Sequence, residues 1–202
     1  MSGLDVRSLG LRHCGSNVRI YPGAKIIGAE HIHIGDNVII DDFVLIYATA
    51  PVFIGSYVHI ASFTSIAGGG EVVLDDFSGL ASGVRVVSGS EDFLGGGLTN
   101  PTVPSRFRKV HRSSVRIGRH AIVGANATLL PDVVVAEGCA VGANTLVSRS
   151  LEPWGVYSGV PARRVRARDS AEILSLEAEL TREYPFEPLA QAMACYQGSA
   201  GG

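Results

Sequence analysis

The sequence predicts an all-β solenoid, in which the chain winds through short strands stacked as triangular coils. Three observations predict it: a large aliphatic residue recurs every six positions, a smaller residue stands four places after it, and turn-forming residues follow directly. Within residues 123–146 the aliphatic positions are Val123, Leu129, Val135 and Val141, and the smaller ones are Ala127, Val133, Cys139 and Thr145. A helix face would recur every three to four residues and a half-buried strand every two, so neither period fits.

The six-residue spacing extends through most of the 202-residue chain. It passes through Ile34, Ile40, Ile46, Ile54, Ile60, Ile66, Leu74, Leu80 and Val86, and resumes at Ile117 to reach Val147. Steps of eight separate the early triplets, so three six-residue sides, with one corner enlarged in places, make coils of 18 to 20 residues. A weaker register begins at Cys14. Because a single coil cannot bury its own apolar side chains, the coils are expected to stack on parallel hydrogen bonds.

The remaining segments interrupt or flank the repeat. Residues 1–13 are expected to cap the first coil through a short helix, and residues 14–166 to form the solenoid. A loop over 88–114 breaks the spacing and must project outward; its prolines favour an ordered, functional arm over a simple surface excursion. Residues 167–202 form an extension, with a helix over about 170–183 that begins at a capping box, a second short helix over 189–196, and a flexible tail. The first helix is expected to cover the open end of the solenoid or to pack on a neighbouring subunit.

Composition limits the classes of partner. The net charge of −2 and the isoelectric point near 6.3 give no reason to expect nucleic acid. No apolar run approaches the 18 residues of a membrane span, and the N-terminus lacks a signal pattern, so a cytoplasmic protein without membrane insertion is expected. Three scattered cysteines are too few for a disulfide framework.

The repeat pattern [LIV]-G-x-x-[AVTS]-x and the closing stretch EPWGVYSGVPARRV resemble the hexapeptide-repeat acyltransferases. The stretches YVHIA, DFSGL and TNPTVP are most similar to the sugar or galactoside-type acetyltransferases of that family. This resemblance implies a left-handed parallel β-helix that transfers an acetyl group from acetyl-CoA to a hydroxyl or amine of a sugar. It also implies a homotrimer with active sites between subunits, and a role in surface-polysaccharide or nucleotide-sugar biosynthesis.

The resemblance also assigns a binding groove for the donor. It places Ala125, Gly142, Ala143 and Ser148 along the pantetheine arm, where small corner residues leave backbone amides uncovered. Arg163 and Arg166 fall where the family binds the phosphates of the nucleotide end, and guanidinium groups suit that task. The alternative is that these arginines belong to a solvated tail.

The general base remains open between two histidines. His59 precedes the inward Ile60, so it points outward from a rigid side of the prism, as a base requires. Many family members carry a histidine at the start of the projecting loop, which the stretch SGSEDF lacks. We therefore expect His59 to be the base, with Glu91 or Asp92 orienting it or the acceptor, and His111 on the arm positioning the acceptor.

A non-catalytic or metal-dependent, carbonic-anhydrase-like β-helix trimer is the alternative function. Zinc needs histidines that meet at one site, but the residues one coil from His59 are Ile39 and Gly79, so no metal is expected. The acidic pairs Asp41–Asp42 and Asp75–Asp76 are interpreted as solvated turns. Three outward apolar residues, Phe43, Tyr57 and Phe63, are expected to support association through the flat sides.

Overall fold

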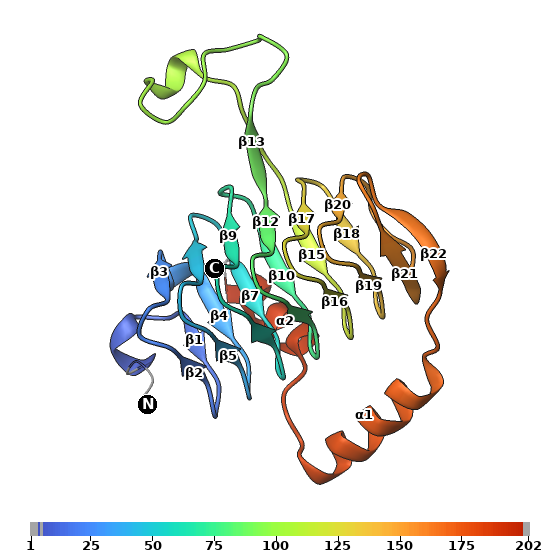
Figure 1. The fold of residues 1–202 in the computed structure, drawn as a ribbon. Coiled ribbons are helices and arrows are strands. Elements are labelled where there is room, and N and C mark those ends of the chain that lie inside the picture. Colours follow the sequence, from blue (N-terminus) through green and yellow to red (C-terminus); the bar gives the residue numbers. More distant parts are fainter. Residues whose placement is uncertain (1–3, 5, 200–202) are drawn as a thin grey trace.

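The computed structural model describes residue 4 and residues 6–199, which form a β-helix built from three parallel sheets (Figure 1). Sheet A holds β1 (His13–Cys14), β4 (Ile32–Ile34), β7 (Val52–Ile54), β10 (Val72–Leu74), β15 (Val115–Ile117) and β18 (Val134–Val135). Sheet B holds β2 (Arg19–Ile20), β5 (Ile39–Ile40), β8 (His59–Ile60), β11 (Gly79–Leu80), β16 (Ile122–Val123), β19 (Ala140–Val141), β21 (Gly155–Ser158) and β22 (Arg163–Ala167). Sheet C holds β3 (Lys25–Ile27), β6 (Leu45–Tyr47), β9 (Ser65–Ala67), β12 (Arg85–Val87), β17 (Thr128–Leu129) and β20 (Leu146–Val147).

The residues of the six-residue spacing face the core of the solenoid, as the sequence predicted. Aliphatic residues of successive coils stand side by side, as Ile34 does with Ile54 and Val123 with Val141. From Ile34 to Val147, every residue of the spacing is buried, at most 4 % exposed. Burial of these side chains along the axis is the main source of stability, because each coil removes the apolar surface of the next from water.

The corner between sheets B and C, here called the B–C corner, is a four-residue turn repeated in each coil. Its turns span residues 41–44, 61–64, 81–84, 124–127 and 142–145. The third residue of each of these turns has a positive φ, which glycine and asparagine adopt most readily. Asn126 and Asn144 fit that preference, whereas two coils carry phenylalanine at this position, Phe43 and Phe63.

The N-terminal segment packs against the first coil, as expected of a cap. It contains the 3-10 helix η1 (Val6–Leu9), and Leu4, Val6, Leu9 and Leu11 contact the core. A second 3-10 helix, η2 (Ala29–His31), lies in the enlarged corner that precedes β4.

The loop over 88–114 projects from the solenoid as an arm, as predicted (Figure 1). Its root is an antiparallel pair, β13 (Gly89–Glu91) with β14 (Val110–Arg112), and its outer part contains the 3-10 helix η3 (Ser105–Phe107). Phe93 and Leu94 near the start of the arm are 90 % and 96 % exposed. The arm therefore offers apolar side chains that its own chain does not cover.

The C-terminal extension differs from the prediction in its path. After the β21–β22 hairpin, α1 (Ala171–Glu183) and α2 (Leu189–Ser199) run back along the side of the solenoid rather than covering its open end (Figure 1). Leu189 of α2 is buried against Phe53 and Val73 of sheet A. The second helix is also longer than expected, and the part of the predicted flexible tail beyond Ser199 lies outside the described residues.

Two details of this extension add to the sequence analysis. In the predicted capping box, Asp169 accepts a hydrogen bond from the Ala171 amide at 3.0 Å, whereas Ser170 makes no side-chain cap. Tyr57 packs edge-on against Phe186 of the extension, with ring centroids 5.3 Å apart. This contact within the chain leaves Phe43 and Phe63 as the exposed members of the predicted apolar set. Among the described residues, no helix is long and apolar enough to cross a membrane.

Candidate active site

A column of small residues follows the B–C corner, one from each of four successive coils. Ser62, Ser82, Ala125 and Ala143 occupy the second position of successive turns. Backbone hydrogen bonds tie these turns together: the amides of Gly83, Asn126 and Asn144 donate to the carbonyls of Ser62, Ser82 and Ala125 at 3.0, 2.9 and 2.8 Å. Neighbouring parallel strands lie about 4.8 Å apart, so the column forms a straight, narrow track along the axis. Ala125, Gly142 and Ala143, which the resemblance assigned to one groove, therefore lie along one edge.

His59 stands beside this track, at the end of sheet B that meets the B–C corner. Its Nε2 lies 3.0 Å from Oδ2 of Asp41, and the imidazole is 55 % exposed. Sequence analysis interpreted Asp41 as part of a solvated turn and missed this contact. The two residues are 18 apart, close to one coil, and that spacing is the signal that could have found it. As expected, the neighbours of His59 in sheet B are Ile39 and Gly79.

The candidate residues of the arm have partners of their own. Glu91 forms an ion pair with Arg108, and the Asp92 carboxylate accepts hydrogen bonds from the amides of Leu94, at 2.9 Å, and Gly96. These backbone hydrogen bonds lower the pKa of Asp92, the one from Leu94 most strongly. Neither carboxylate bonds to His59 of the same chain.

His111 at the arm root faces a turn of the next coil. Its Nε2 lies 2.8 Å from Oδ2 of Asp132, whose pKa is lowered chiefly by this hydrogen bond. The amide of Asp132 in turn donates to the Ser113 hydroxyl at 3.0 Å. His111 thus joins the arm to the solenoid, and both candidate bases have a carboxylate beside one ring nitrogen.

A basic pocket lies at the far end of the solenoid. It encloses about 200 Å³ and is lined by Ser148, Arg149, Arg163 and Arg164, among others. The structure therefore brings together Ser148 and Arg163, as the resemblance implied, and adds two arginines that sequence analysis did not select. Arg166 pairs with Val156 in the terminal hairpin and does not line this pocket.

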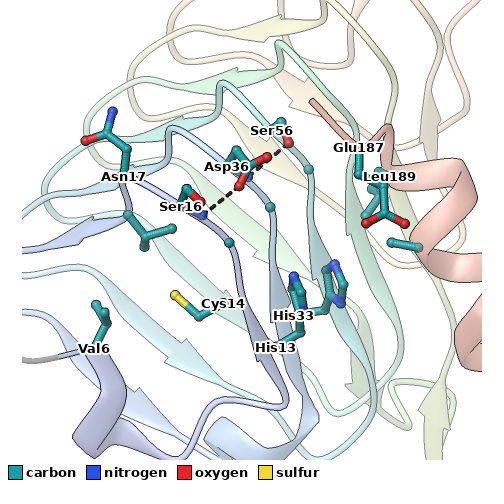
Figure 2. Close-up of a pocket in the computed structure, with 15 residues that line it drawn as sticks. Val6, His13, Cys14, Ser16, Asn17, His33, Asp36, Ser56, Glu187 and Leu189 are labelled. Atoms are coloured by element: carbon teal, nitrogen blue, oxygen red, sulfur yellow. Dashed lines mark hydrogen bonds between the residues drawn. The ribbon is translucent and has the colours of Figure 1, made fainter. Parts of the chain in front are cut away.

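A larger cavity lies elsewhere. It encloses about 760 Å³ between the first coils and the start of α2, and Figure 2 shows His13, His33, Asp36 and Glu187 among its lining. The rings of His13 and His33 stack at 4.2 Å, and burial, together with the nearby His13, lowers the pKa of His33 to about 4. None of the candidate site residues lines it. Among the described residues, no group of three or more His, Cys, Asp or Glu side chains is placed to hold a metal ion.

Asp76 also departs from the sequence interpretation, and His120 lies buried near it. Asp76 is 1 % exposed rather than solvated, and it accepts hydrogen bonds from the amides of Ser56 and Leu189 at 2.8 and 3.2 Å. His120 is buried beneath α1, where its Nε2 lies 2.7 Å from Oε2 of Glu177. Both residues fasten the C-terminal extension to the solenoid.

Comparison with known proteins agrees with this geometry. The family model described as bacterial transferase hexapeptide (six repeats) matches residues 114–149. The chain is 37 % identical over 176 residues to dTDP-4-amino-4,6-dideoxy-D-glucose acyltransferase of Escherichia coli, covering 87 % of this chain and 91 % of the relative. It is 38 % identical to AntD, an N-acyltransferase from Bacillus cereus solved with dTDP and 3-hydroxybutyryl-CoA, with a TM-score of 0.84 over 89 % of this chain and 94 % of AntD.

Further structures of AntD bear on the site. One variant was solved with dTDP-4-amino-4,6-dideoxyglucose and coenzyme A, at a TM-score of 0.84, 38 % identity and coverage of 89 % and 95 %. AntD was also solved with substitutions at one serine and at an aspartate ten residues after it. Ser82 and Asp92 stand at the same spacing in this chain.

The fold and these relatives define a coenzyme A-dependent acyltransferase of the β-helix class. The chain belongs to the hexapeptide-repeat acyltransferase family, to which its repeat and its relatives assign it. The predicted family, fold and enzyme class are confirmed, and the predicted sugar substrate and acyl-CoA donor agree with these relatives.

Proposed function

We propose that the protein transfers an acyl group from a coenzyme A thioester to the amino group of a nucleotide-linked 4-amino-4,6-dideoxyhexose. The relatives that span nearly the whole chain carry this specificity in their names and bound ligands. This assignment selects N-transfer from the two outcomes that the sequence left open. A dTDP-linked acceptor is the form that the relatives support.

The observation that carries this proposal is the alignment of candidate groups along the B–C corner. His59 with Asp41 stands at one end, Ser82, Ala125 and Ala143 follow coil by coil, and the basic pocket ends the line. This order suits a donor laid along the axis, with its phosphates at the arginines and its thioester toward His59. The spacing of Ser82 and Asp92 supports roles for both in the acceptor site.

The chemistry follows from these groups. The acceptor amine attacks the thioester carbonyl, the new C–N bond forms, and the C–S bond breaks to release the coenzyme A thiolate. His59 takes the proton that the amine loses and returns it to the thiolate, while Asp41 holds the imidazole. Backbone amides of the corner are the donors available to the developing oxyanion.

The active form is proposed to be a homotrimer with sites between subunits. Asp92 directly follows β13 in the arm, and the arm projects from its own solenoid (Figure 1), so the proposal brings Asp92 to a corner of a neighbouring copy. The exposed Phe93 and Leu94 give the arm an apolar surface for that contact. Closed three-fold symmetry would repeat the same contact in each subunit.

The test is an acceptor and donor panel. The protein is incubated with acetyl-CoA or 3-hydroxybutyryl-CoA and dTDP-4-amino-4,6-dideoxyglucose, and free thiol and product mass are followed. The matched control is dTDP-6-deoxyglucose, which carries a hydroxyl in place of the amine. Thiol release with the amine alone supports N-transfer, release with the control alone establishes O-transfer, and release with neither rejects the proposed acceptor.

A further inference from the structure

Two exposed aromatic rings, Phe43 and Phe63, stand beside the small-residue track, on the turn that holds Asp41 and on the turn that follows His59. Phe43 and Phe63 are 63 % and 60 % exposed and have φ angles of 64° and 66°. A bulky residue in the left-handed region is strained, and here no burial offsets the strain. Asn126 and Asn144 occupy the same position in later coils with φ near 57°, so the turn itself does not require a ring.

The two rings form a short stack that is open at its end. Their centroids lie 5.2 Å apart and their planes differ by 5°. The next residue of the column is Gly83, at φ 77°, so no side chain covers the outer face of Phe63 from that coil. A Cβ at Gly83 would lie 2.2 Å from Oδ1 of Asn126, which means that the position could not accept a larger residue without displacing this amide.

The groups around the open face suit a nucleotide. Arg85 donates from Nη1 to the carbonyls of Phe63 at 2.6 Å and Gly83 at 2.9 Å, which places a guanidinium beside the backbone of these two turns. The Asn126 carboxamide can both donate and accept hydrogen bonds, as the edge of a base requires. Proteins commonly bind a nucleobase with an aromatic ring that stacks on it, a nearby cation and a side chain that forms hydrogen bonds with its edge.

We propose that Phe43 and Phe63 form a stacking platform for the nucleobase of the nucleotide-linked acceptor, with Arg85 facing its diphosphate. This inference rests on the proposed function and adds the subsite that would hold the nucleotide. The base of coenzyme A is the other source of the same chemistry. The basic pocket of Arg149, Arg163 and Arg164 lies in the last coils, about three coil spacings or ~14 Å from Phe63, and the donor nucleotide belongs there.

The experiment exploits the asparagine found in the later coils. Phe43→Asn and Phe63→Asn remove the rings but keep a residue that the turn accepts, and Phe63→Tyr keeps a stacking ring. Calorimetric titration with dTDP and, separately, with coenzyme A compares these variants with the wild type. We expect each asparagine variant to bind dTDP roughly 5- to 150-fold more weakly, the range measured for loss of one base–aromatic stack. Phe63→Tyr should bind dTDP as the wild type does, and coenzyme A affinity should be unchanged throughout.

Each other result overturns the platform in a distinct way. Equal dTDP affinity in the asparagine variants removes the rings from the site while leaving the proposed function intact. Weakened coenzyme A binding with normal dTDP binding assigns the rings to the donor. A change of oligomeric state in light scattering, with the loss of dTDP binding, makes the pair a subunit contact. If the wild type itself binds no dTDP, the proposed acceptor is wrong, and the proposed stacking platform is rejected as well.

Discussion

Asp41 and His59 come from successive coils, and their side chains meet at 3.0 Å between Oδ2 and Nε2. The core fixes the backbone at both residues, because the adjacent Ile40 and Ile60 are fully buried and paired in register. A carboxylate that occupies one ring nitrogen leaves the other to exchange a proton with substrate. The rigid coil therefore supplies both the imidazole and its orientation.

His59→Ala should lower kcat by about 10²- to 10⁴-fold, the usual contribution of a general base, with the affinity for coenzyme A unchanged. Asp41→Asn should cause a smaller loss and shift the pH profile of kcat, because it alters the charge beside the imidazole. Steady-state kinetics from pH 5.5 to 9 measure both effects. His111→Ala is the matched control, since His111 lies at the root of the arm and has its own carboxylate partner, Asp132. A larger fall in kcat for His111→Ala than for His59→Ala would move the base to the arm.

Arg163→Ala should raise the Michaelis constant for acetyl-CoA about 10- to 100-fold with little change in kcat. The reason is the loss of a charge-assisted hydrogen bond to phosphate, worth about 1.5–3 kcal/mol. Arg166→Ala provides a comparison on the same strand, because Arg166 does not line the basic pocket. The sequence resemblance gave the two residues one role, whereas the structure predicts a strong effect for Arg163 and a weak one for Arg166. Equal effects of the two substitutions would contradict the assignment of this pocket.

The stacked pair of His13 and His33 predicts a loss of stability in mild acid. Burial lowers the pKa of His33 to about 4, below its ordinary value near 6.5, so the unfolded chain binds the extra proton first. Stability is then fully present above pH 6.5 and falls as the pH drops toward 4. The expected cost at pH 5 is about 2 kcal/mol at most.

His33→Phe should abolish this part of the acid sensitivity while keeping a ring between His13 and Phe53. Denaturant unfolding at pH 7 and pH 5 gives the comparison. Taking the difference between variant and wild type removes other titrating groups, such as Asp76, whose pKa is raised by burial and whose effect on stability has the opposite sign. An identical loss between pH 7 and pH 5 in both proteins would show that His33 is not responsible.

The β-helix could be predicted from sequence because its determinant is local and repeated. Ile34, Ile54 and Leu74 occupy the same inward position in successive coils, and each is recognisable from its own six-residue repeat without knowledge of tertiary contacts. The corner residues Ala125 and Ala143 follow from the same register. A site built on such positions can therefore be located from the sequence alone.

Sequence analysis could not predict contacts between the solenoid and segments outside the repeat. Asp76 lies in a stretch whose composition is typical of a solvated turn. In the structure it is buried beneath the extension and accepts a hydrogen bond from the amide of Leu189, 113 residues later. The path of the extension over Phe53 and Val73 depends on a surface that exists only after the coils have stacked. The partner of His59 was missed for a simpler reason, because Asp41 was considered with its sequence neighbour rather than with the residue one coil away.

The last prediction concerns the shared site. Asp92 lies in the projecting arm and His59 on the solenoid, and the proposed trimer joins Asp92 of one subunit to His59 of another in one site. His59→Ala and Asp92→Ala should each be nearly inactive alone. Proteins refolded or expressed together should regain activity, because some sites then combine an intact His59 with an intact Asp92. Random mixing in equal amounts predicts about a quarter of wild-type activity for two-subunit sites in a closed ring. Mixing the same variants after separate assembly, without exchange, is the control and should stay inactive. If co-assembled proteins stay inactive although mass spectrometry detects mixed oligomers, both residues act within one chain and the arm does not complete its neighbour's site.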